Sequence, residues 1–101
     1  MRNCRNATFE WSAAAVRDMA RLHRFFAQKN ADAARRAIQS IRIGVKNLAA
    51  QPQIGRFAEN QKPEFRELLI EFGDSGYITL YRYADDTVTI LAVRHQKEIG
   101  H

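Results

Sequence analysis

The chain has few of the residues on which disulfide frameworks, membrane anchors and secretion signals depend. Its one cysteine, Cys4, has no partner within the chain, which is typical of proteins from a reducing compartment. No apolar run approaches the roughly 20 residues that span a bilayer, and no apolar segment follows the basic start Met1–Arg5 as in a signal peptide. We therefore expect a cytoplasmic protein that has no contact with a membrane.

Several familiar catalytic signatures are also missing. The sequence has no glycine-rich phosphate loop, no H-E-x-x-H motif and no pair of cysteines spaced for a metal. His23, His95 and His101 could bind a metal only by converging in space. A catalytic triad of Ser75, His95 and Asp74 lacks the spacing of a nucleophile elbow. We therefore predict neither a metal site nor a cofactor.

The length of the chain suits one domain, residues 1–101. Its charge is distributed unevenly along this length. The formal charge is +5, but residues 1–58 hold eleven Lys/Arg against three acids, whereas residues 59–101 hold five against eight. The basic part would speed encounters with nucleic acid, an acidic protein or a ribosome. A surface that is merely well solvated explains the charge equally well.

Two amphipathic helices are predicted in the basic part. Ser12 can cap the first, and Asn30 can cap the second, which Gln51–Pro52 ends because proline disfavours helical geometry in the residue before it. The apolar residues at helical spacing are Ala15, Met19, Leu22 and Phe26 in the first helix and Ala34, Ile38, Ile41, Val45 and Leu48 in the second. The link between the helices is so short that they form an antiparallel hairpin.

The rest of the chain predicts a small sheet. Its expected elements are strands at 6–9, 65–72, 77–83 and 87–94, with turns at 73–76 and 84–86. Turns this short favour antiparallel neighbours. We therefore expect an α+β fold in which the helical hairpin packs on one face of a mainly antiparallel sheet, leaving the other face open. Which face is open is undecided, since the run Val88–Val93 is apolar on both sides.

One loop is long enough to serve a function. The segment Gln53–Phe57 has the composition of a turn, and Gly55 can adopt a positive φ there beside Arg56.

Five side chains on this loop and the sheet could act together on a phosphodiester: Arg56, Arg66, Arg82, Arg94 and His95. Cleavage without a metal requires a proton acceptor, fixed cations at the phosphate and an acid for the leaving oxygen. Arginine suits the second role, and histidine titrates near neutral pH. However, strand alternation places Arg94 and His95 on opposite faces, and nearby acids offer the arginines internal partners, namely Glu67, Glu71 and Glu98. Spacing alone therefore favours structural salt bridges over catalysis.

The motifs, taken in order, resemble the RelE/ParE toxin superfamily of bacterial type II toxin–antitoxin modules. They are Asn30–Ile38, Pro52–Arg56, Glu64–Leu68, Gly76–Ile78 and Val93–Glu98. The similarity spans nearly the whole chain, and the superfamily's fold, a helical hairpin on a small antiparallel sheet, agrees with the fold predicted from the residues.

The resemblance implies a toxin, of the kind that inhibits growth or stabilises a plasmid, held silent in a hetero-oligomer with a cognate antitoxin. ParE-like members poison DNA gyrase, whereas RelE-like members cut messenger RNA on the ribosome. The ending Arg94–Gln96 is similar to that of ParE-like chains, and the lysine cluster of RelE-like nucleases is reduced to Lys62 and Lys97. Gyrase poisoning is therefore favoured over the alternative, a ribosome-dependent endoribonuclease.

The resemblance also implies the residues that would act. Those expected to contact the target are Arg56, Arg66, Arg82, Arg94, His95 and Lys97. In the nuclease alternative, Arg66 and Arg82 would hold the phosphate and His95 would serve as acid or base. A third alternative is a detoxified adaptor that only binds its antitoxin.

Overall fold

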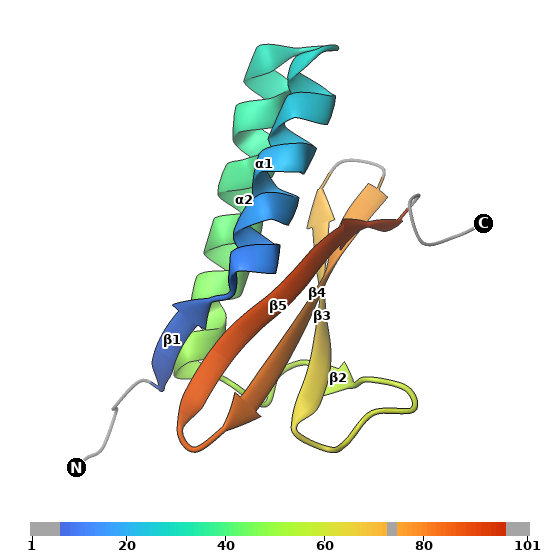
Figure 1. The fold of residues 1–101 in the computed structure, drawn as a ribbon. Coiled ribbons are helices and arrows are strands. Elements are labelled where there is room, and N and C mark those ends of the chain that lie inside the picture. Colours follow the sequence, from blue (N-terminus) through green and yellow to red (C-terminus); the bar gives the residue numbers. More distant parts are fainter. Residues whose placement is uncertain (1–6, 73–74, 97–101) are drawn as a thin grey trace.

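Two helices pack against one side of a twisted sheet of five strands (Figure 1). The computed structural model describes residues 7–72 and 75–96. In chain order the elements are β1 (Thr8–Trp11), α1 (Ala13–Ala27), α2 (Ala31–Ala50), β2 (Arg56–Phe57), β3 (Phe65–Phe72), β4 (Ser75–Ala84) and β5 (Thr87–His95). Figure 1 shows α1 and α2 side by side as a hairpin. The predicted α+β fold is confirmed.

Both helices begin at the predicted caps. The Ser12 hydroxyl accepts the Ala15 N–H at 3.0 Å. The Asn30 side chain accepts the N–H groups of Asp32 at 3.0 Å and Ala33 at 3.1 Å. These bonds satisfy amides that the first turn of a helix leaves without partners, so the local sequence fixes where each helix starts.

The strand order is β1-β5-β4-β3-β2, and every pairing except one is antiparallel. The exception is β1, which pairs in parallel with the first half of β5, from Thr8 opposite Thr87 to Trp11 opposite Ile90. The first strand thus ends two residues later than predicted, because Trp11 pairs with β5 and the Ser12 N–H still bonds to the Ile90 carbonyl at 2.9 Å. Asn6, its predicted start, lies outside the described residues.

The structure describes one of the two predicted hairpin turns in full and the other only in part. Asp85 and Asp86 join β4 to β5 with φ values of 54° and 59°, as a two-residue turn of type I′ requires, so this turn is confirmed. Of the other turn, Gly73 and Asp74 lie outside the described residues, and Gly76 already pairs with Glu71 in the β3–β4 ladder.

A β-bulge in β5 brings apolar residues from both halves of the strand onto the face that the helices cover. Leu80 pairs with Ala92 and Tyr81 with Ile90, so Leu91 is an extra residue in the ladder. Ile90 and Val93, three residues apart, are consequently both buried. The bulge explains why this run is apolar on both sides.

The covered face and the open face carry different residues. The buried residues of β4 and β5 under the helices are Tyr77, Thr79, Tyr81, Val88, Ile90, Val93 and His95. They pack against the apolar stripes of α1 and α2, including Leu22, Ile41 and Leu48. Alternation places Leu69, Ile78, Leu80 and Arg82 on the other side, which we call the open face. Leu69 is half-exposed there.

Candidate functional site

The predicted site residues divide between the two faces of the sheet. Arg66 pairs with Tyr81, and the neighbouring pair is Phe65 with Arg82. Because residues directly opposite one another share a face, Arg66 lies on the covered face and Arg82 on the open face. These two cations therefore do not meet at a common phosphate position.

Arg66 is occupied with the loop that precedes β2. Its Nη1 donates to the carbonyl oxygens of Gly55 at 2.8 Å and Gln53 at 3.2 Å. Its guanidinium also lies over the Phe57 ring, 4.2 Å from the ring centre. Each of these contacts fixes part of the segment Pro52–Phe57, which we call the clamped loop.

Tyr81 also holds the clamped loop, through two hydrogen bonds of its hydroxyl group. Its hydroxyl donates to the Pro52 carbonyl at 2.7 Å and accepts the Gly55 N–H at 3.0 Å. Burial raises the pKa of Tyr81, an effect that the Gly55 hydrogen bond and the Arg66 charge oppose. The hydroxyl therefore keeps its proton and can donate at neutral pH.

Gly55 does not adopt the positive φ that the sequence allowed. Its φ lies outside the left-handed region, and glycine is required there by close approach instead. A Cβ at this position would lie 2.6 Å from both the Glu67 carbonyl oxygen and the Tyr81 hydroxyl. The loop therefore sits directly on β3 and β4 with no room for a side chain.

The other arginines of the sheet each pair with an acid. Arg56 bonds to Glu67 through Nε at 3.2 Å, as the sequence suggested. Arg82 pairs with Glu64, and this hydrogen bond is the main cause that raises the pKa of Arg82. Glu64 was not among the acids that the sequence indicated.

Asp18 of α1 is a structural residue that sequence reasoning missed. Its Oδ2 accepts the Val93 N–H at 2.9 Å and an N–H from Arg94 at 2.7 Å. The carboxylate thus occupies the edge of β5 beyond the end of β1 and joins the helix to the sheet. The available signal was that Asp18 is the one acid among the cations of α1.

His95 is buried on the covered face. Its ring lies 5.5 Å from that of Phe26 and 5.2 Å from that of Tyr77, centre to centre. Arg94 is exposed on the opposite face, as alternation predicted. Lys97 lies outside the described residues.

The structure does not bring Arg66, Arg82 and His95 together. His95 pairs with Tyr77, and Arg66 pairs with Tyr81, four residues farther along β4. His95 and Arg66 are thus separated by roughly 13 Å along the strands and roughly 10 Å across them. Arg82 faces the other way. Proton transfer needs groups within hydrogen-bond reach, so this arrangement does not form a single cleavage site.

Among the described residues, most exposed cations without an ion pair lie on the helical hairpin, and Lys62, in the loop before β3, is a further one. Within residues 7–72 and 75–96, Arg17, Arg24, Arg42 and Lys46 are exposed and form no ion pair. The charge distribution correctly predicted that the hairpin is positive, but it did not indicate which of the hairpin's cations are unpaired.

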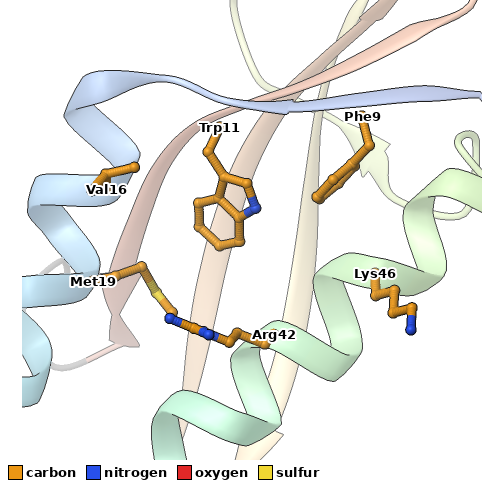
Figure 2. A pocket seen from close by; sticks show the side chains of 6 residues that line it. All are labelled: Phe9, Trp11, Val16, Met19, Arg42 and Lys46. Atoms are coloured by element: carbon orange, nitrogen blue, oxygen red, sulfur yellow. The ribbon is translucent and has the colours of Figure 1, made fainter.

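Two of these cations border a pocket of about 560 Å³. We call it the aromatic groove; it is lined by Phe9, Trp11, Val16, Met19, Arg42 and Lys46. Figure 2 shows the Trp11 indole and the Phe9 ring pointing from β1 toward α2, with Arg42 extended toward Met19. The groove is therefore apolar inside and cationic along one rim, and none of the described residues that line it is an acid.

The described residues hold neither a metal-binding cluster nor a helix that could span a membrane. No cluster of three or more His, Cys, Asp or Glu side chains there could hold a metal ion. No helix in that part of the chain is both long enough and apolar enough to cross a bilayer.

Sequence comparisons match nearly the whole chain. Residues 9–100 match the family described as "ParE toxin of type II toxin-antitoxin system, parDE". The chain is also 36% identical over 84 residues to a Caulobacter vibrioides protein called Toxin RelE3, an alignment that covers 83% of this chain and 88% of that one.

Structural comparisons show the same fold. A chain of the chromosomal ParDE toxin–antitoxin system from P. aeruginosa superposes with a TM-score of 0.74 at 20% identity, covering 88% of this chain and 95% of that chain. A chain of the RelBE2 toxin–antitoxin complex from Mycobacterium tuberculosis has a TM-score of 0.62 at 21% identity, covering 90% of this chain and 99% of that one.

Proposed function

This chain belongs to the ParE toxin family of type II toxin–antitoxin systems and is the toxin component of such a system, and we propose that it acts by poisoning DNA gyrase. The observation that carries this choice of target is the separation of Arg66, Arg82 and His95 over two faces of the sheet. A toxin that binds and traps its target needs a complementary surface, whereas a nuclease needs converging acid, base and cations.

The expected target-contact residues divide accordingly. We propose that Arg56, Arg82 and Arg94, whose side chains remain 74%, 39% and 46% exposed, contribute to the target surface in addition to their internal ion pairs. Arg66 and His95 then act by holding the loop and the covered face in place. Exposed charges of this kind mainly steer association rather than supply affinity.

The alternative target is the ribosome with its messenger RNA. It is favoured by one relative, Toxin RelE3, whose name places it with the RelE branch. In that case Arg66, Arg82 and His95 would have to meet after a rearrangement of the sheet or with groups supplied by the ribosome.

Both targets can be tested with one purified protein. The toxin is incubated with gyrase and supercoiled DNA, and cleaved DNA is quantified after denaturation of the enzyme. In parallel, a translated message is mapped for new 5′ ends. Accumulation of cleaved DNA with an intact message is expected; intact DNA with codon-phased cuts in the message would contradict the proposal. A parallel His95→Ala variant would lose RNA cleavage by roughly a hundredfold only if His95 were an acid or base.

We also propose where the antitoxin binds. The aromatic groove offers Phe9 and Trp11 to an apolar side chain, and Arg42 and Lys46 stand four residues apart on α2 at its rim. Side chains at this spacing lie on one face of the helix, where they can pair with acids one turn apart on a partner. An acidic amphipathic segment of the antitoxin therefore fits the groove, in the mode by which helices occupy apolar grooves.

A further inference from the structure

We infer that side chains of α1 close the uncovered edge of β5 and so prevent a second copy of this chain from pairing with it. The inference goes beyond the proposed function, because it concerns how the toxin avoids associating with itself and not what it poisons.

β1 covers only the first half of β5. Their parallel pairing ends with Trp11 opposite Ile90, where the chain turns into α1 while β5 continues (Figure 1). On that side, no strand among the described residues pairs with the segment Leu91–His95, which we call the distal edge. Backbone groups along an edge of this kind are a template for another strand. The distal edge therefore needs other partners for its backbone groups.

The side chains of α1 and its cap supply these partners. The Ser12 hydroxyl donates to the Leu91 carbonyl at 3.3 Å. The Asp18 carboxylate accepts the Val93 N–H at 2.9 Å, and Nη2 of Arg21 donates to the Val93 carbonyl at 3.5 Å. Both backbone groups of Val93 are thus bonded to side chains, where the interior of the sheet uses backbone.

The β-bulge determines which backbone groups need these partners. Before the extra residue Leu91, the Ile90 carbonyl faces β1 and accepts the N–H of the α1 cap at 2.9 Å. After it, the N–H and the carbonyl of Val93 face the same side. Asp18 and Arg21 can both reach them because they stand three positions apart on α1, which places them on one face of the helix.

The two groups of Val93 are also those that a second copy would use. When two identical strand edges meet antiparallel about a twofold axis, the residue on the axis lies opposite its own copy. In a hydrogen-bonded pair of this kind, each N–H bonds to the carbonyl of the other residue. Asp18 and Arg21 therefore occupy the positions that Val93 of a second copy would take.

Two features favour the closed edge over a dimer. The bond from Val93 to the Asp18 carboxylate is charge-assisted, and it avoids the loss of translational and rotational freedom that association costs. Arg94 lies beside it, bonded to Asp18 at 2.7 Å and to the Val93 carbonyl at 3.5 Å. Without Asp18, its charge would face the same charge of the second copy. Charged side chains at an edge commonly prevent strand addition.

The test is the double variant Asp18→Ala with Arg94→Ala, which removes the acceptor and the like charge together. We expect the purified full chain to dimerise with a dissociation constant at least tenfold below that of the wild type, measured by sedimentation equilibrium. In dilute solution the Val93 amide should exchange with solvent at least tenfold faster than in the wild type. It should become protected again at concentrations where the dimer forms.

Asp18→Asn with Arg94→Ala is the matched control. Asparagine gives the same net charge as alanine but keeps a side-chain oxygen that can accept the Val93 N–H, so this variant should dimerise no more than the wild type. Leu48→Ala controls for lost stability, because it weakens the core from a fully buried position on α2 and leaves the distal edge unchanged. If the alanine double variant does not fold, Asp18→Leu with Arg94→Ala replaces it, since leucine also lacks an acceptor but keeps the side-chain volume.

The outcomes decide the inference in either direction. Dimerisation of the variant without an acceptor, with the Val93 amide protected in the dimer, supports it. Equal dimerisation of the Asp18→Asn control overturns it, because the bond to Val93 would then not be what closes the edge. Equal dimerisation of Leu48→Ala overturns it as well, since association would follow from instability alone. A variant that stays monomeric while its Val93 amide exchanges fast shows that an open edge does not recruit a second copy, which also contradicts the inference.

Discussion

The helical hairpin and the sheet both carry many charges, but they use them differently. On the sheet and its loop, Arg56, Arg66, Arg82 and Arg94 all have internal partners. On the hairpin, Arg42 and three other exposed cations have none among the described residues. The arginines that the sequence analysis proposed as site residues therefore stabilise the sheet and its loop. The cations that it placed on a solvated helix face are instead available to partners.

The cause is the position of the acids. The hairpin has two, Asp18 and Asp32. Asp32 pairs with Arg35 and Arg36 at the start of α2, whereas Asp18 reaches across to β5 and neutralises Arg94 there. Asp18 also pairs with Arg21 of α1 at 3.5 Å, so the hairpin shares one of its two acids with the sheet, which increases the positive field that it presents outward.

The largest effect predicted from this comparison is on stability and comes from Asp18. Replacing Asp18 by alanine leaves the Val93 N–H and the Arg94 guanidinium without their acceptor, at a site where the carboxylate is only 14% exposed. We expect the free energy of unfolding to fall by about 3 kcal/mol, because a nearly buried donor and a paired charge are stranded together. Urea denaturation measures the change.

Asp32→Ala is the matched control within the hairpin. The Asp32 side chain is 56% exposed, and its ion pairs stay on one helix. Its loss should cost about 0.5 kcal/mol from the exposed pairs and the helix dipole. If the two variants lost the same free energy of unfolding, this would contradict the claim that Asp18 connects the hairpin to the sheet.

The next effect concerns the unpaired cations. Charge reversal by Arg42→Glu with Lys46→Glu places like charges against an acidic antitoxin segment in the aromatic groove. We expect the antitoxin to bind about thirtyfold more weakly, which is about 2 kcal/mol, with toxicity unchanged. Titration of the toxin with its cognate antitoxin measures the affinity.

The control reverses two other unpaired cations, Arg17 and Arg24, which do not line the groove. It changes the net charge by the same amount, so it corrects for long-range attraction. If both double variants lose the same affinity, the groove has no special role and only the overall field matters.

Local signals explain how much of the fold the sequence predicts. Ser12 and Asn30 predict where the helices begin because a capping side chain bonds only to neighbouring amides. Pro52 predicts the end of α2 because proline disfavours helical geometry in the residue before it. The Asp85–Asp86 turn is found in the same way. Each of these features depends on residues within one or two turns of chain.

The site could not be predicted to the same extent because its contacts are distant in sequence. Asp18 and Arg94 are 76 positions apart, and Tyr81 lies 26 positions from Gly55. The bulge at Leu91 leaves no signature in the apolar run around it. Composition indicated that arginines would pair with acids, but only the packing of helix on sheet selects Asp18 and Glu64.

A smaller effect is expected on the covered face of the sheet. Thr79 is fully buried, and its hydroxyl has no hydrogen-bond partner among the described residues. Thr79→Val replaces that hydroxyl by a methyl of similar size, so we expect the free energy of unfolding to rise by about 1 kcal/mol. Thr89→Val, at a position that is not fully buried, should change it much less. A loss of stability in Thr79→Val would show that the hydroxyl is satisfied in solution.

The smallest effect is a dependence on alkaline pH that belongs to the sheet. Burial raises the pKa of Tyr77, and burial is also the main cause that raises the pKa of Tyr81, above the value of about 10 in the unfolded chain. A raised pKa means that the folded state favours the neutral phenol. The resulting stability is fully present below about pH 10 and is lost as the pH rises through the folded pKa. Unfolding of the wild type and of Tyr77→Phe, measured at closely spaced pH values, should therefore diverge in slope only above about pH 10, with the wild type losing stability faster. Parallel curves would mean that the Tyr77 phenol ionises in the folded protein as readily as in the unfolded chain, and that the alkaline limit is set by groups the two proteins share.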